Sequence, residues 1–319
     1  MESSLQEKRS YEIGAYILLL LTAIIWAGTW PLGRWLVSEE VGGDTIPPMM
    51  IAAIRYFVVI LPFLIILRWR ESSLNLKFMR ENWKIFCLMG ILSVTIYQAG
   101  YLYGEYYTSS SDAVVIVSSH PTLVVILASF VFKIESLSWK RLIGILLSFS
   151  GILLIFGFSP NLNVPNRILG DLLIFFGAIS YAAYIVISRH FLNSFETESQ
   201  PSSLYIVTWV SCFGFLTTIP IALFLHPEYL SPILYFQVPE RVWFGIAYLS
   251  FISTILGYWF YLEGVKRLTA SRAAIFQNLV PIFGVILSAI LLEEIIDPLI
   301  HTSAILLIIL GITIVNRVR

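Results

Sequence analysis

The sequence predicts an all-α integral membrane protein whose ten transmembrane helices form two inverted repeats of five helices. The first observation is composition: 58% of residues are apolar and 13% are charged, about half the usual share of roughly 25%. The second is a series of charge-free stretches long enough to cross a bilayer, and the third is self-similarity between the two halves. This composition excludes whole-chain disorder and nucleic-acid binding, and it leaves no room for a soluble domain.

Ten stretches are expected to span the membrane, because a helix needs about 20 mostly apolar residues to cross it. One of them is interrupted by a single charge, Arg55. In chain order the stretches are 13–33, 46–67, 85–104, 113–132, 142–166, 172–188, 199–227, 242–262, 273–292 and 298–316. The first is read as a span and not as a cleaved signal, because it is long and no small-residue cleavage site follows it.

The distribution of Lys and Arg predicts the orientation. Ten spans put both termini on one side, and if that side is the cytoplasm it holds sixteen Lys and Arg residues against three outside. The outer three are Arg34, Arg167 and Arg241. This bias favours ten spans with cytoplasmic N- and C-termini. The absence of a targeting tail suits a multi-pass protein of the cytoplasmic (inner) cell membrane.

The two halves of the chain resemble each other. A shift of 160 residues places Gly104 on Gly264 and Pro121 on Pro281, and a shift of 155 places Arg34 on Arg189. Five spans per half is an odd number, so the halves must cross the membrane in opposite directions, as in many secondary transporters. We therefore expect a cytoplasmic segment at 1–12, a first repeat at 13–157, a connector at 158–169 and a second repeat at 170–319.

The repeats resemble those of the drug/metabolite transporter superfamily, EamA type. Each half opens with a similar segment, AIIWAGTWPLGR at 23–34 and AISYAAYIVISR at 178–189. Each fourth span has a central proline and a glutamate near its end, Glu135 or Glu294, although Ser303 and Ala304 stand where the family usually has glycine. The resemblance implies a ten-helix transporter of small metabolites in which spans one, three, four, six, eight and nine line a central cavity.

Three ionisable residues require an explanation, since charges within the hydrocarbon layer are costly. Arg55 lies roughly 12 Å from the outer end of span two. It is either a structural arginine, with Glu105 or Asp112 as its partner, or an anchor for a substrate carboxylate. Glu105 and Asp112 lie at span ends, where an interfacial or helix-start role explains them and proton coupling is the alternative; Ser109 and Asp112 have capping-box spacing.

Polar and aromatic side chains supply the candidate substrate contacts. His120 directly precedes Pro121, where a kink is expected, and Gln277 and Asn278 precede Pro281. Aromatic residues recur at helical spacing on four spans, and their rings suit apolar or cationic solutes. His120 is either a substrate contact or proton-sensitive group, or a histidine satisfied by a neighbouring carbonyl or serine. The other residues have helix packing as their alternative role. The candidate substrate-binding residues are Trp26, Trp30, Tyr97, Tyr101, Ser119, His120, Tyr181, Tyr184, Tyr258, Tyr261, Gln277 and Asn278.

The function expected from these observations is transport, with export favoured, of small metabolites such as amino acids by alternating access. A membrane-embedded enzyme is one alternative, but the chain has no H-E-x-x-H or G-x-S-x-G pattern and no metal site is expected from Cys87 and Cys212. A scaffold or receptor is another, but it leaves the inverted repeat unexplained. The expected partners are a small-molecule substrate and the lipid bilayer, with no cofactor, no nucleic acid and a monomeric state.

Overall fold

A computed structural model describes residues 2–41, 46–133, 138–160, 164, 166–196, 200–268 and 276–317. Within these ranges the regular structure is entirely helical. Nine of the described helices are long and apolar enough to cross a membrane, and a tenth apolar helix, Leu279–Leu291, is shorter and follows the undescribed range 269–275. The predicted all-α membrane fold is confirmed.

The first half has five spans in the order that the sequence predicts. The third and fourth spans are each built from successive helical segments rather than from one uniform helix. The elements are α1 (Glu2–Val37), α2 (Pro48–Glu71), α4 (Trp83–Gly90), η2 (Ile91–Ile96), α5 (Tyr97–Tyr107), α6 (Ser110–Val117), α7 (His120–Ile126), η3 (Leu127–Val131) and α8 (Trp139–Phe158), with η1 (Glu39–Val41) and α3 (Leu76–Glu81) in the connections.

The second half repeats this order. Its elements are α9 (Arg167–Asn193), α10 (Ser203–Leu225), α12 (Glu240–Ala247), η5 (Tyr248–Leu256), α13 (Gly257–Arg267), α15 (Leu279–Leu291) and α16 (Pro298–Arg317), with η4 (Pro227–Leu230) and α11 (Pro232–Gln237) before α12. Helix α8 ends at Phe158 and α9 begins at Arg167, so part of the expected connector is already helical. Residues 161–163 and 165 of the connector lie outside the described ranges, as does Glu135.

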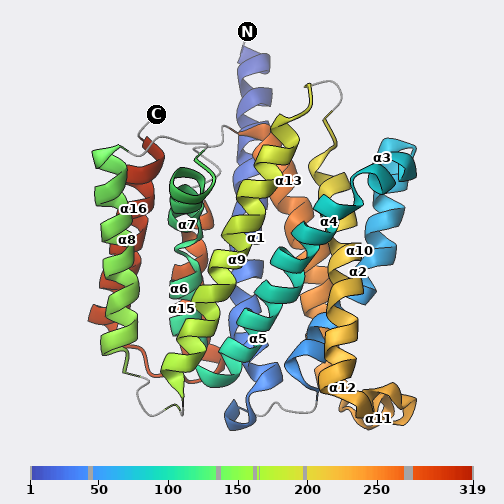
Figure 1. Ribbon diagram of the computed structural model, residues 1–319. Coiled ribbons are helices and arrows are strands. Elements are labelled where there is room, and N and C mark those ends of the chain that lie inside the picture. Colours follow the sequence, from blue (N-terminus) through green and yellow to red (C-terminus); the bar gives the residue numbers. More distant parts are fainter. Residues whose placement is uncertain are drawn as a thin grey trace.

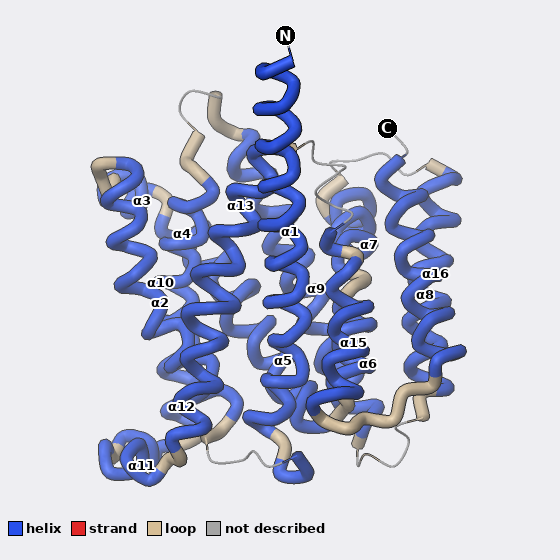
Figure 2. The backbone as a smooth tube through the Cα atoms, turned by 180° about the vertical axis from the view of Figure 1, so that it is seen from behind, coloured by secondary structure: helices blue, strands red, loops and turns tan. Residues whose placement is uncertain are grey.

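The two halves run in opposite directions across the bundle. Figure 1 shows α1 entering at the top of the view and α9 entering at the bottom, while the start of α1 and the end of α16 lie at the same end. Figure 2 shows the same arrangement from behind. The first span of each half packs along the third span of the other, α1 on α13 and α9 on α5. The halves are therefore interlocked and not side by side.

Glycine contacts reveal a half-turn relation between the repeats. Where α8 crosses α16, a Cβ on Gly144 would lie 2.6 Å from the Gly311 carbonyl oxygen, and one on Gly151 would lie 2.7 Å from the Ala304 oxygen. A shift of 160 residues exchanges these two contacts, because it carries 144 onto 304 and 151 onto 311. Each glycine is needed because the facing backbone leaves no space for a side chain.

The interlocked helices repeat the relation. A Cβ on Gly104 would lie 2.6 Å from Ile174 side-chain atoms, and one on Gly264 would lie 2.6 Å from Leu19 Cγ. The shifts of 160 and 155 residues that align the halves convert one contact into the other. The inverted repeat predicted from sequence is thus present in the packing of the helices.

Irregular segments occur at matching depths. Helix α6 ends at Val117, a turn covers Ser118 and Ser119, and α7 begins at His120, so the break expected at Pro121 is confirmed. Spans three and eight contain π-helical segments, η2 and η5, whose residues 91–96 and 251–256 correspond under the 160-residue shift. Such segments shift the side chains of a helix and are frequent at functional sites.

The outer surface suits lipid. On α2, the bulky residues Phe57, Leu61 and Ile65 follow one another at four-residue spacing and are all exposed. The opposite face of α2 buries Val59 and Phe63 against the bundle. Helix α11, which the sequence analysis did not anticipate, exposes Phe236 at the end of the bundle opposite the termini (Figure 1).

Candidate functional site

Aromatic rings from four spans meet in the middle of the bundle. The Tyr181 ring on α9 lies 4.9 Å from the Tyr97 ring on α5 and 5.0 Å from the His120 ring on α7. It also lies 5.4 Å from the Tyr184 ring, and its hydroxyl is 3.3 Å from the hydroxyl of Tyr258 on α13. Tyr181 is therefore the centre of a cluster that joins both halves of the molecule.

Trp26 continues this aromatic cluster onto α1. Its ring lies 5.6 Å from the Tyr258 ring and 5.3 Å from the Tyr261 ring. Its indole nitrogen donates a hydrogen bond of 3.1 Å to the carbonyl oxygen of Ser253 in η5. The π-helical segment thus supplies an acceptor that holds the tryptophan in place.

A narrow crevice lies beside Trp26 and Tyr261, between α1 and α15. Gln277 and Phe276 also line it, and it has no space for a water molecule. Gln277, although exposed, thereby lies next to Trp26 and Tyr261. The rings of the cluster pack on one another in this conformation, so a solute must separate them to reach the centre.

His120 has a buried polar atom, Nε2, without a hydrogen bond to any described residue. A neighbouring carbonyl or serine, which is the alternative for this histidine, does not satisfy Nε2 among the described residues. An imidazole nitrogen facing Tyr97 and Tyr181 can donate to or accept from a bound solute.

Four other candidate residues lie apart from the rings around Tyr181. Trp30 and Tyr101 form a separate pair with ring centres 5.0 Å apart, and the Tyr101 hydroxyl donates to the Thr29 carbonyl oxygen at 2.6 Å. The Ser119 hydroxyl donates to the Ile116 carbonyl oxygen, as a structural serine does. Asn278 is half-buried before α15, and no described contact joins it to the rings.

Arg55 reaches inward from α2 to polar side chains of both halves. Its Nε and Nη2 donate to Thr254 Oγ1 in η5 at 3.1 and 2.9 Å, and its Nη1 donates to Gln98 Oε1 on α5 at 3.3 Å. The expectation that Glu105 or Asp112 is its partner is wrong, because the π-helical turn brings a threonine to the guanidinium instead. Gln98 and Thr254 were not singled out from the sequence.

Asp112 belongs to a fully buried polar network at one end of the bundle. Its carboxylate accepts from Ser159 Oγ at 2.7 and 2.9 Å, from His301 Nε2 at 3.2 Å and from Arg167 Nη1 at 3.4 Å. Arg167 also donates to Asp171 at 3.1 Å. Ser109 caps α6 by accepting from the Asp112 amide, as predicted, but the Asp112 side chain is used for the network and not for the helix start.

A second buried ion pair lies at the same end. Arg34 Nε is 3.4 Å from Glu294 Oε1, and the two Glu294 oxygens accept from the Ser110 and Ser111 amides at 2.8 and 2.9 Å. Arg34 also donates to the carbonyl oxygens of Glu105 and Thr108. These contacts join α1, α5, α6 and the end of α15, and they lock this end of the bundle.

The Glu105 side chain differs from the other buried carboxylates. It is fully buried, and neither oxygen has a hydrogen-bond partner in the described part of the chain. Its own backbone carbonyl is bound by Arg34, whose charge is already used by Glu294 and Glu40. The Glu105 carboxyl group is therefore buried near Arg34, which already pairs with Glu294 and Glu40.

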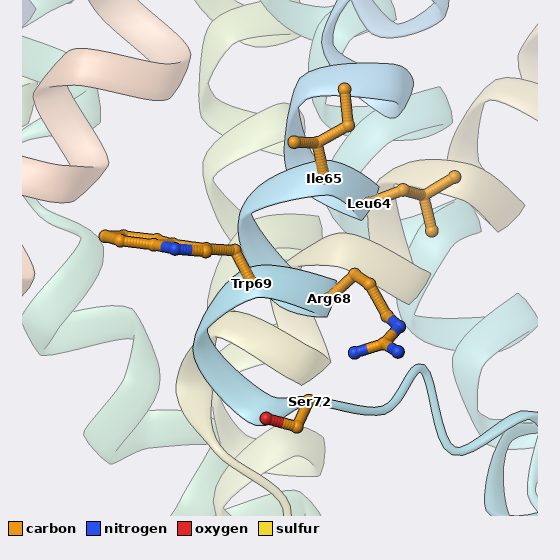
Figure 3. A pocket seen from close by; sticks show the side chains of 5 residues that line it. All are labelled: Leu64, Ile65, Arg68, Trp69 and Ser72. Atoms are coloured by element: carbon orange, nitrogen blue, oxygen red, sulfur yellow. The ribbon is translucent and has the colours of Figure 1, made fainter.

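The outer surface also has a shallow hollow of about 530 Å³ on α2, shown in Figure 3. Its lining residues are Leu64, Ile65, Arg68, Trp69 and Ser72, and Trp69 extends away from the helix in the opposite direction to Arg68. None of the predicted site residues lines it. An exposed tryptophan and arginine at a helix end are typical of the bilayer interface.

Metal ligands do not gather anywhere in the residues that the structure describes, judged by groups of three His, Cys, Asp or Glu. Cys87 and Cys212 are free thiols.

Known proteins share both the sequence pattern and the fold. The EamA-like transporter family matches residues 13–157 and again residues 168–317. The uncharacterized transporter YyaM of Bacillus subtilis (strain 168) is 29% identical over 278 residues, which cover 86% of this chain and 85% of that protein. A probable amino-acid metabolite efflux pump of Escherichia coli (strain K12) is 24% identical over 281 residues, covering 87% of each chain.

A solved crystal structure of another protein superposes with a TM-score of 0.58 at 18% identity, covering 96% of both chains, which shows a common fold. The family match spans nearly the whole chain and falls once on each half. Together with the inverted helices, this makes the protein a transmembrane transporter and not an enzyme: the chain belongs to the EamA-like transporter family.

Proposed function

We propose that this transporter exports amino acids or related small metabolites by alternating access, with the aromatic cluster around Tyr181 as its substrate site. The observation that carries the proposal is the meeting of Tyr181 with Tyr97, His120 and Tyr258, because these residues come from both halves and lie at the centre of the bundle. Ring faces bind the apolar or cationic part of a solute, and the phenols and the unpartnered His120 Nε2 bind its polar groups.

Two features support alternating access. The half-turn relation between the repeats gives two conformations of similar packing, one open to each side. The Asp112 and Arg34 networks lock one end of the bundle, so the described conformation is held together by polar contacts at that end. Opening that end requires these contacts to separate while contacts at the other end form.

The orientation and the direction of transport form part of the same proposal. The excess of Lys and Arg favours cytoplasmic termini in the cell membrane, which places the locked end outside. The efflux role named for the Escherichia coli relative supports export of amino-acid metabolites. The fused ten-span chain supplies both halves of the site, so we propose that one copy is sufficient.

Counterflow in proteoliposomes tests this proposal. Vesicles loaded with one unlabelled solute, from a panel of amino acids, amines and nucleosides, are expected to accumulate the labelled form transiently, with or without an imposed proton gradient. Tyr181→Ala and His120→Ala should abolish accumulation. Phe176→Ala is the matched control, because Phe176 is an exposed aromatic residue on the same helix. Absence of counterflow for the whole panel, or normal counterflow in both site variants, contradicts the proposal.

A further inference from the structure

Three arginines are buried within the described part of the bundle, and one of them has no acidic partner there. Their exposed fractions are 3% for Arg34, 4% for Arg167 and 7% for Arg55. Arg34 pairs with Glu294, and Arg167 pairs with Asp112 and Asp171. Arg55 contacts only neutral side chains, so its positive charge is not compensated by any described residue.

The hydrogen bonds of Arg55 leave part of its guanidinium free. A guanidinium has five N–H donors. The bonds to Thr254 and Gln98 use three of them, one on each nitrogen, so one N–H on Nη1 and one on Nη2 remain unused by the described residues. Those two nitrogens form the edge of the fork that binds the two oxygens of a carboxylate.

The guanidinium also lies beside the proposed substrate site. Gln98 directly follows Tyr97, and Thr254 lies one helical turn before Tyr258. The Arg55 Cζ atom lies 5.8 Å from the centre of the Tyr56 ring, and Gln98 Nε2 donates to the Tyr56 hydroxyl at 3.3 Å. The hydrogen bonds of Arg55 therefore place its guanidinium against the two spans that carry Tyr97 and Tyr258, on the side of α2.

Arg55 is not part of the framework that the two halves share. The Ser250 hydroxyl donates to the Arg55 carbonyl oxygen at 3.5 Å, and a Cβ on Gly90 would lie 3.0 Å from the Val210 carbonyl oxygen. The repeat converts one contact into the other, so Val210 corresponds to Arg55. The backbone carbonyls of Arg55 and Val210 therefore make corresponding contacts in the two halves, while the positive charge occurs in the first half alone.

A buried arginine with neutral partners is costly, and an anion that arrives with the solute removes that cost. One guanidinium matches one carboxylate. A phosphate carries more charge and normally requires several Lys or Arg groups, and no lysine lies deep in any span of this sequence. The geometry therefore favours a monocarboxylate over a phosphorylated solute.

We propose that Arg55 binds the carboxylate of the transported solute, so that the substrates of this transporter are small monocarboxylates such as α-amino acids. Thr254 and Gln98 orient the guanidinium, and the aromatic cluster binds the rest of the molecule. This proposal rests on the proposed transport function and assigns the chemical class of its substrate.

Matched pairs of solutes test it on the purified full-length protein. Each amino acid in the counterflow panel is compared with its amide, which has nearly the same shape but no negative charge. Wild-type protein should bind the acid more tightly than the amide. Arg55→Gln should reduce this preference by about tenfold to a hundredfold, since hydrogen bonds to charged groups contribute that much, and Arg55→Lys should retain part of it. Arg68→Gln, at an exposed arginine on the same helix, should leave it unchanged.

The acid-to-amide ratio separates binding from folding, because loss of folded protein lowers both affinities equally. An unchanged ratio in Arg55→Gln shows a structural arginine and overturns the proposal. A wild-type protein that transports solutes but prefers the amides also overturns it, and leaves the transport function standing. Failure of every solute in wild-type counterflow contradicts the transport function itself.

Discussion

Replacement of Asp112 by asparagine should destabilise the protein by about 3 kcal/mol. Removing one partner of a buried ion pair costs roughly 3–5 kcal/mol, because the remaining charge stays buried. The lower end applies here, since Arg167 keeps Asp171 as a partner and donates to two backbone carbonyl oxygens, those of Ile155 and Phe156. The amide nitrogen of asparagine also places a donor where Ser159 or Arg167 now donates.

The assay is thermal unfolding of the purified protein in detergent. For chains of 150–250 residues each kcal/mol shifts the melting temperature by about 2–4 °C, and the shift decreases with size. We therefore expect a decrease of roughly 6 °C for Asp112→Asn, taking about 2 °C for each kcal/mol. Glu81→Gln is the control, because it removes the exposed pair with Lys77 and should shift melting by less than about 1 °C. If Asp112→Asn has the same melting temperature as Glu81→Gln, the buried network does not stabilise the fold as argued.

Three further predictions use the same melting assay. Gly144→Ala should destabilise the protein by about 1–3 kcal/mol, because its Cβ would lie 2.6 Å from the Gly311 carbonyl oxygen. Gly157→Ala is the control, because a Cβ there has open space and should not destabilise the protein. Equal melting temperatures of the two variants would refute close packing of α8 on α16. Tyr101→Phe removes the 2.6 Å hydrogen bond to the Thr29 carbonyl and should cost about 1 kcal/mol. Tyr103→Phe on the same helix is its control, and a larger loss there would contradict the assignment. Glu105→Gln should melt at or above the wild-type temperature, because it removes a buried carboxyl group that has no described hydrogen-bond partner. A fall in melting temperature as large as that of Asp112→Asn would show that Glu105 has a partner.

The sequence predicts the helices well because a helix that crosses the bilayer must be apolar over about 20 residues. Charge-free stretches located the spans, and the Gly and Pro matches between halves predicted an inverted repeat that the contacts of Gly144 and Gly264 bear out. The break before Pro121 followed from the missing amide of proline. These are local or periodic properties that a single sequence displays directly.

The buried charges could not be predicted in the same way. A search for charge-free stretches ends each span at its flanking charges, with Arg55 as the exception, so Arg167 and Asp171 were excluded from span six although both are buried residues of α9. The partners of Asp112 lie 55 and 189 residues further along the chain, in Arg167 and His301, and only the fold brings them together. The π-helical turn that presents Thr254 to Arg55 also has no periodic signal in the sequence.

The seam between α8 and α16 has a consequence for the balance of the transport cycle. In a transporter with two identical inverted halves, the inward-open and outward-open conformations would have equal free energy, because a half-turn converts one into the other. Here Gly151 faces Ala304 where Gly144 faces Gly311, and Ser148 corresponds to Ile308, so the two halves of the seam are not identical. In the proposed alternating-access cycle, differences of this kind make the packing energies of the two forms unequal, and Ala304→Gly would make this glycine contact alike in both halves.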